Sequence, residues 1–261
     1  MNRHSRLVRN CSAALALALA ATLFIDPALL NAQQAPKKKK RKKSHFHLSV
    51  DSAAHFLPSR SFGPHTVGGY FFPDRKGATW TILTVQTVLN DSTKVVRRDS
   101  VINREVVVDT ASYSLQGLPL IKCQDRAYKP HGTDTATTDV FYYVDDSVAM
   151  TVFNNSVSHQ LNKIFLVSPL EIGNRWHDKY GDSVQTVIAG YADSVITPMG
   201  RFDSVLVTLT RMGHADLRKF FARGYGVVKT IFRSPGPSGH GIIIIEATMT
   251  ECRRPDTRSD E

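Results

Sequence analysis

Residues 183–212 read SVQTVIAGYADSVITPMGRFDSVLVTLTRM, two runs rich in β-branched and aromatic residues on either side of Pro-Met-Gly. Val, Ile, Thr and Phe are the residues that strands favour. Pro198 and Gly200 favour a tight turn, because proline presets its own φ and glycine accepts a positive φ. The segment therefore predicts an antiparallel β-hairpin formed by residues 183–197 and 201–212.

The same pattern extends over most of the chain, as short β-rich runs separated by Gly, Asn or Asp-Ser. The candidate strands are residues 45–51, 80–90, 94–109, 114–122, 139–144, 149–154, 163–167, 183–197, 201–212, 217–222, 227–233 and 241–251. Helical periodicity is weak, and only residues 157–164 and 214–223 offer a short helix as an alternative. We therefore predict a mostly all-β fold, an antiparallel meander forming a barrel, half-barrel or sandwich with little helix.

Two of these runs, residues 164–167 (IFLV) and 241–245 (GIIII), do not alternate between apolar and polar positions. Such runs are typical of strands in the middle of a layer that is covered on both sides. An apolar second face needs a cover, which can be a small helix, another sheet, an apolar ligand or a partner protein.

The two tryptophans each follow a glycine by three positions, as Gly77 precedes Trp80 and Gly173 precedes Trp176. Glycine permits a tight turn, and a large aromatic side chain at the start of the next strand can fill the end of a barrel or sandwich. These four residues are predicted to be structural rather than catalytic.

Further motifs accompany them. They are Phe71-Phe72-Pro73, Ile172-Gly173, Thr197-Pro198-Met199-Gly200-Arg201-Phe202 and the segment FFARGYGVVK at residues 220–229. In this order the motifs resemble those of a group of uncharacterised bacterial exported proteins, over about 160 residues. The resemblance implies an antiparallel β-rich exported fold and carries no catalytic group. Tyr225 departs from the group's pattern, although Gly224 and Gly226 on either side of it suit a bulge or close backbone approach.

The first 32 residues have the three parts of a secretory signal. Arg3, Arg6 and Arg9 precede an apolar run over residues 11–25, and Ala32 offers a cleavage site. A signal retained as a membrane anchor is the alternative. The chain is therefore predicted to be exported, to a periplasmic, outer-membrane-associated or extracellular location.

The formal net charge is +10, and its location limits the classes of partner. Residues 1–32 contribute +2 and the basic arm contributes +7, which leaves +1 for all other residues. The basic arm consists of Lys37, Lys38, Lys39, Lys40, Arg41, Lys42 and Lys43. A nearly neutral body argues against nucleic-acid binding, whereas the arm itself suits an anionic polymer or membrane surface.

These features divide the chain into four parts. We predict a signal peptide at 1–32, a basic disordered linker at 33–44, a single β-rich domain at 45–252 and a disordered tail at 253–261. Removal of the signal would leave Cys123 and Cys252, which are a candidate disulfide in an exported chain. Two separately buried thiols are the alternative.

Signals for catalysis and cofactors are weak. No nucleophile elbow, phosphate loop, dinucleotide fingerprint or His-Glu-x-x-His motif occurs. His45 and His47 would share one strand face, as a metal site requires, but an exposed strand start is the simpler interpretation. His240 lies in a Gly/Pro-rich segment that reads as a turn. We therefore assign no catalytic residue, metal or cofactor.

The functional prediction follows from the strands that are apolar on both faces. It is an exported, non-enzymatic β-rich domain that binds an apolar ligand or a protein partner at a sheet face or barrel mouth. Two alternatives remain open at this point. One is a cell-envelope hydrolase with a site assembled from loops, and the other is a surface-association protein that acts through the basic arm.

Overall fold

The computed structural model describes residues 65–70, 75–113, 119–128, 134–152, 163–177, 184–236 and 239–254. The predicted signal, the basic arm, the predicted strand at 45–51 and the tail after residue 254 lie outside these residues.

The described chain consists of strands and one helical turn, α2 (Val67–Tyr70). The strands are β1 (Thr79–Leu89), β2 (Val95–Tyr113), β3 (Pro119–Tyr128), β4 (Asp134–Val144), β5 (Val148–Thr151), β6 (Ile164–Val167), β7 (Arg175–His177), β8 (Gln185–Thr197), β9 (Gly200–Met212), β10 (Ala215–Ala222), β11 (Gly226–Pro235) and β12 (Ile242–Arg253). Residues 214–223, for which a helix was the alternative, belong mainly to β10, because Leu217, Lys219 and Phe221 alternate inward.

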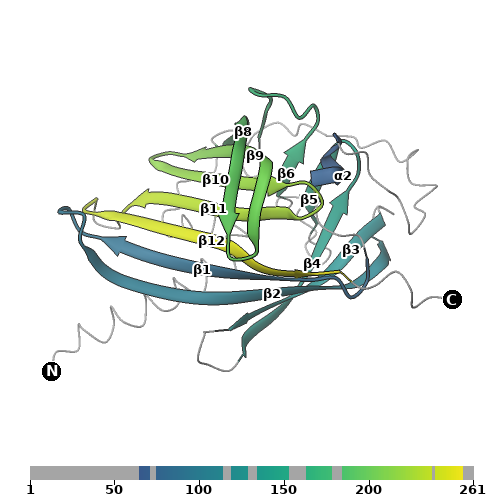
Figure 1. Cartoon of the computed structure of the whole chain (residues 1–261), viewed down its shortest axis with the longest axis horizontal. Coiled ribbons are helices and arrows are strands. Elements are labelled where there is room, and N and C mark those ends of the chain that lie inside the picture. Colours follow the sequence, from purple (N-terminus) through teal and green to yellow (C-terminus); the bar gives the residue numbers. More distant parts are fainter. Residues whose placement is uncertain are drawn as a thin grey trace, which may run out of the picture.

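All the strands belong to one antiparallel sheet in the order β6-β5-β4-β3-β2-β1-β12-β11-β10-β9-β8-β7 (Figure 1). Strands that follow one another in sequence pair, except β6 and β7, which are the two ends of the sheet, and the first strand β1 also pairs with the last strand β12. This arrangement confirms the predicted antiparallel meander with little helix.

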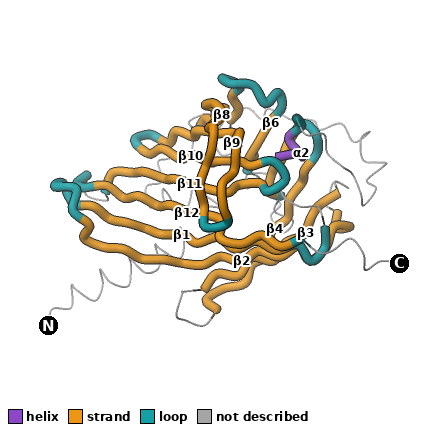
Figure 2. The backbone as a smooth tube through the Cα atoms, in the orientation of Figure 1, coloured by secondary structure: helices purple, strands orange, loops and turns teal. Residues whose placement is uncertain are grey.

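The strands form one continuous curved sheet (Figure 2), and its two end strands, β6 and β7, are joined through side chains. The amide nitrogen Nδ2 of Asn174 donates to the carbonyls of Val167 at 3.1 Å and Pro169 at 2.7 Å. Trp176 Nε1 donates to the carbonyl of Ile164 at 3.5 Å. The sheet is therefore a nearly closed barrel, with an inner face that encloses the core and an outer face.

The inner face holds the apolar core, because alternate residues of each strand point inward. On β12 these are Ile245, Ala247 and Met249, each no more than 3% exposed. The run 164–167 was expected in the middle of the layer and instead forms edge strand β6. Its Phe165 and Leu166 are nevertheless both buried, since this edge lies against β7.

The barrel has an end covered by α2. Val67 and Tyr70 are at most 1% exposed, and Arg223 Nε donates to the Tyr70 hydroxyl at 3.0 Å. The N–H of Gly224 donates to the Gly69 carbonyl at 2.8 Å, and Gly224 has φ 70°. This close approach of two backbones agrees with the role predicted for a glycine at this position.

The predicted hairpin of residues 183–212 is confirmed as β8 and β9, with Thr197 paired to Gly200 around the turn. Residues 206–212 of β9 pair with β10 and so extend the sheet. Beyond this ladder, the part of the hairpin nearer its turn crosses the outer face of β11 and β12, as Figure 1 shows. Within the hairpin, Val195 and Thr197 are buried, whereas Ile196 between them is 75% exposed.

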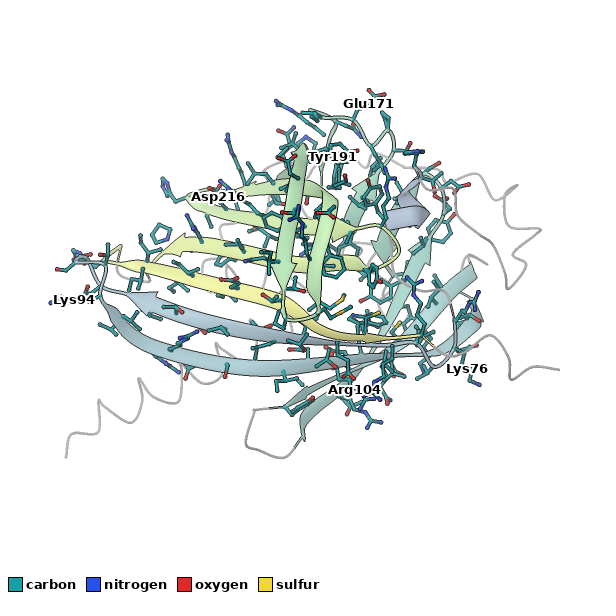
Figure 3. The ribbon with its side chains drawn as sticks, in the orientation of Figure 1. Lys76, Lys94, Arg104, Glu171, Tyr191 and Asp216 are labelled. Atoms are coloured by element: carbon teal, nitrogen blue, oxygen red, sulfur yellow. The ribbon has the colours of Figure 1, made fainter. Side chains whose placement is uncertain are left out.

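Charged side chains lie mainly at the periphery. Figure 3 labels Lys76, Lys94, Arg104, Glu171 and Asp216, all of which are exposed. Because these charges remain in water, the polar groups that are buried inside the barrel stand out as exceptions.

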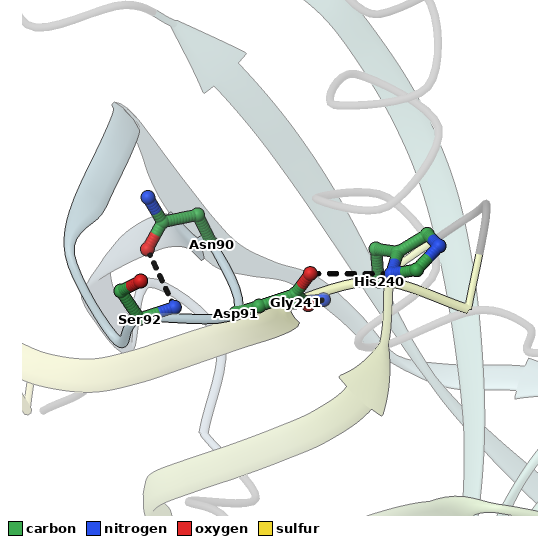
Figure 4. Close-up of polar contacts among 5 residues, drawn as sticks. All are labelled: Asn90, Asp91, Ser92, His240 and Gly241. Carbon is green, nitrogen blue, oxygen red and sulfur yellow. Dashed lines mark hydrogen bonds and ion pairs between the residues drawn. The ribbon is translucent and has the colours of Figure 1, made fainter.

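At one end of the long strands, two loops are joined (Figure 4). Asp91, between β1 and β2, accepts a 2.6 Å hydrogen bond from the N–H of Gly241 and lies 3.2 Å from His240 Nδ1. Gly241 has φ 72°, and a Cβ there would overlap the carbonyl oxygen of Leu89. Only glycine therefore fits this position without a backbone shift.

Candidate functional site

A groove of about 340 Å³ lies on the outer face of the sheet, between the strands and the tip of the β8–β9 hairpin. We call it the outer groove. Its floor is formed by β1 and β12 in direct register, where Leu83 pairs with Thr248 and Thr87 pairs with Ile244. Its volume lies at the lower end of the range typical of small-molecule sites.

Five of the eleven residues that line the outer groove are apolar. Leu83, Val85 and Ile244 contribute the floor, and Ile196 and Pro198 contribute the wall from the hairpin tip. The three floor residues are only half-buried. Apolar side chains that a fold leaves half-covered in a concave site are what an apolar ligand would bury.

Three ionic side chains line the outer groove: Arg98, Lys229 and Glu246, the last of which pairs with Val85 in the middle of the floor. Lys229 Nζ lies 2.6 Å from Glu246 Oε1, so these two charges neutralise each other. Arg98 is exposed and forms no ion pair with any described residue. The groove therefore carries one net positive charge, at the end where Arg98 pairs with Thr87.

A second polar group lies inside the barrel. Glu105 of β2 is 4% exposed and accepts a 2.7 Å hydrogen bond from the Tyr142 hydroxyl. Its cross-strand neighbour Asp125 is 8% exposed and accepts from Asn103 Nδ2, at 3.3 Å to Oδ2. Asn103 Oδ1 is buried without a hydrogen-bond partner among the described residues. These four residues form the inner acidic cluster.

The inner acidic cluster is arranged to hold protons. Burial and, to a smaller extent, the charge of Asp125 together raise the pKa of Glu105 to about 8, against the lowering effect of the Tyr142 hydrogen bond. Burial also raises the pKa of Asp125 to about 6. Glu105 is therefore mainly protonated at neutral pH, which removes the cost of burying two adjacent negative charges.

One hollow in the barrel is small. The hollow lined by Phe165, Thr186, Thr208 and Lys219 has a volume of about 10 Å³, close to that of one water molecule. Lys219 Nζ lies over the Phe165 ring, 4.5 Å from its centroid. Of these two spaces, the outer groove is the one large enough for a ligand.

The structure places the residues that the sequence analysis named as structural in the core and in turns. Trp80 and Trp176 lie in the core, at 5% and 7% exposure, and Gly77 and Gly173 before them have positive φ. Pro198 and Gly200 form the β8–β9 turn, while Gly224 and Gly226 lie between β10 and β11 with φ 70° and 75°. Of these, only Pro198 lines the outer groove.

The predicted disulfide between Cys123 and Cys252 is not formed, and both thiols are free. Cys123 lies on β3 and Cys252 on β12, with β2 and β1 between them. Three strand spacings of about 4.8 Å separate them by about 14 Å, which exceeds the roughly 4.4–6.8 Å between bridged Cα atoms. Burial also raises the pKa of the Cys123 thiol, which makes it a poor nucleophile.

The Asp91–His240 pair is the arrangement that a loop-built hydrolase site would use. However, His240 and Asp91 are 77% and 67% exposed, and Asp91 is engaged with the Gly241 backbone. We interpret the pair as a contact that joins two loops. No cluster of three or more metal-ligating side chains occurs among the described residues, and His45 and His47 lie outside them.

The sequence interpretation missed the inner acidic cluster. A signal was present, because Val101, Asn103, Glu105 and Val107 alternate along one strand and all four are buried. Strict alternation places the two polar residues on the same face as the two valines. The outer groove had no comparable signal, since it depends on where the β8–β9 hairpin turns.

No helix in the described ranges is long and apolar enough to cross a membrane. No known family model and no curated protein matches the chain. Among solved structures, a candidate exported protein with a YmcC-like fold from Bacteroides fragilis is 10% identical, with a TM-score of 0.42, over 71% of this chain and 100% of its own. A candidate lipoprotein from Parabacteroides distasonis is 14% identical, with a TM-score of 0.38, over 70% and 97%. At these values the likeness adds nothing to the argument about function.

Proposed function

We propose that this chain is an exported, non-enzymatic β-rich protein that binds an apolar ligand in the outer groove. The observation that carries the proposal is an open groove of about 340 Å³ in which Leu83, Val85 and Ile244 are left half-buried. Export is supported by the signal-like residues 1–32.

The proposal also gives a role to the apolar second face of the β12 run. Ile245 packs into the core, whereas Ile244 points to the outer groove. The β8–β9 hairpin covers this face only in part. A bound apolar molecule would complete the cover, with a gain of about 25 cal/mol for each Å² of apolar surface removed from water.

The test is binding of Nile red, a neutral apolar dye, to the folded chain and to two variants. Leu83→Asp places a charge on the groove floor and should weaken dye binding by about tenfold or more, because the buried carboxylate would lose its hydration. Val96→Asp is the control, since Val96 is 61% exposed and lies outside the groove.

Circular dichroism should show that both variants fold. If Leu83→Asp fails to fold, Val85→Asp is used in its place. Equal dye binding by the groove variant and the control would refute the outer groove as the ligand site.

A further inference from the structure

The outer groove has a positive charge at one end of its floor, and this position of the charge indicates the chemistry of the ligand. The following inference rests on the proposed function. Along β1, the floor runs from Thr87 at one end through Val85 to Leu83. This distance is about 13 Å, at roughly 3.3 Å per residue. Arg98 pairs with Thr87 and so stands at one end of the floor.

Arg98 is the one groove cation whose charge is not neutralised within the described residues. Lys229 is held by Glu246 at 2.6 Å, and the neighbouring Arg97 is held by Asp99 at 2.5 Å. Arg97 pairs with Val88 and lies on the opposite face of β2. A guanidinium beside an apolar floor is suited to a carboxylate or phosphate, which it can bind with two parallel hydrogen bonds.

We propose that the outer groove binds a monomeric amphiphile with an anionic head, such as a fatty acid, with the head at Arg98 and the chain along Val85 and Leu83. The chain would lie beneath Ile196 of the hairpin tip, which is 75% exposed without a ligand. Charge and apolar surface would then be matched at both ends of the molecule.

The shape of the site favours a single molecule over a lipid bilayer. The hairpin tip at Ile196 and Pro198 forms a wall beside the floor, so the apolar residues line a concave space. A flat membrane surface could not reach the floor at Leu83 without displacing this wall. The occupant is therefore taken to be a free amphiphile rather than a membrane.

The test compares three ligands that share one chain and differ in the head: laurate, lauryl alcohol and laurylamine, each below its aggregation concentration. We expect the affinity to fall in that order, with laurate bound about tenfold or more tightly than the alcohol. Arg98→Gln should remove the preference for laurate and leave binding of the alcohol unchanged. Added salt should reduce the same preference.

Arg104→Gln is the matched control, because Arg104 is exposed on the same strand and does not line the groove. Equal loss of laurate binding in Arg98→Gln and Arg104→Gln would overturn the assignment of the head to Arg98. Equal binding of laurate and alcohol by the parent chain would overturn the anionic head and leave the proposed function standing. Failure of all three ligands and of Nile red would reject both.

A last experiment distinguishes two sources of an anionic head group, a free amphiphile and a membrane lipid. Vesicles of phosphatidylglycerol are offered to the parent chain and to Arg98→Gln. We expect the same vesicle binding for both, because the basic arm, which both chains carry, is the segment suited to an anionic surface. Vesicle binding that depends on Arg98, together with no binding of monomeric laurate, would overturn the proposal of a free amphiphile.

Discussion

The inner and outer faces of β1 and β12 both carry large apolar side chains, yet the two faces differ in what covers these side chains. On the inner face, Ile82 and Ile245 are at most 4% exposed, because the barrel closes over them. On the outer face, Leu83 and Ile244 are half-buried beside a hairpin that crosses only part of the sheet. The comparison teaches that an apolar run identifies a surface to be covered and does not say what covers it.

The largest effect is expected from two neighbouring isoleucines on these opposite faces. Ile245→Ala should reduce the free energy of unfolding by about 2–5 kcal/mol, since it leaves a cavity in the closed core. Ile244→Ala should cost about 1 kcal/mol or less and should weaken binding of an apolar dye. Denaturant titration of both variants measures the difference, and equal losses would contradict the distinction between the faces.

The next effect concerns the loops where both faces end. Gly241→Ala should destabilise the chain by about 1–3 kcal/mol, because the new Cβ meets the Leu89 carbonyl at a positive φ. Gly239→Ala is the control, with φ 76° and open space around its Cβ. Thermal unfolding should rank the parent first, Gly239→Ala second and Gly241→Ala last. The prediction is wrong if the two variants unfold at the same temperature.

The inner acidic cluster predicts that the free energy of unfolding depends on pH. Glu105 has a pKa of about 8 when folded and an ordinary value of 4.5, so the folded state binds the extra proton between these values. Stability should therefore be highest at the acidic end of this window and fall as pH rises towards 8, by up to about 1.4 kcal/mol per pH unit. Asp125, with a pKa of about 6, acts in the same direction.

Glu105→Gln should flatten this dependence, because glutamine resembles the protonated acid and can still accept from Tyr142. Glu171→Gln, on an exposed residue, should leave the dependence as in the parent. Denaturant titrations at several pH values provide the measurement. An unchanged slope in Glu105→Gln would exclude this residue as the source.

The smallest effect is expected at the Lys229–Glu246 pair on the outer face. Lys229→Ala should change stability by about 1 kcal/mol or less, since the pair is partly exposed and screened by water. It would release Glu246 and place an unpaired carboxylate in the groove. Laurate should then bind more weakly than to the parent, whereas lauryl alcohol should bind nearly as before.

Much of the fold could be predicted because the evidence for it is local. Pro198 and Gly200 identify the β8–β9 turn, and alternation over residues 201–212 identifies a strand. Strand order could not be predicted, since pairing β1 with β12 depends on contacts between residues far apart in sequence. For the same reason the run 164–167 was expected in mid-sheet and instead forms edge strand β6.

Of the candidate site, the sequence predicted only that an apolar sheet face would have to be covered by another element, a ligand or a partner. The isoleucine run indicated a second apolar face, but the groove depends on the path of the β8–β9 hairpin across the sheet. The role of Arg98 depends on which other cations already have partners, and that is a property of the folded surface. The disulfide was wrong for a related reason, because sequence separation says nothing about how many strands lie between two cysteines.

The pairing of β1 with β12 also has a consequence for how the chain assembles. The ladder from Thr79–Arg253 to Leu89–Ile242 joins the strands β1–β6 to the strands β7–β12 through the middle of the sheet. A chain that emerges with its N-terminus first cannot form this ladder until its last strand is available. The barrel is therefore a late product of synthesis, and the incomplete chain stays open for as long as β12 is missing.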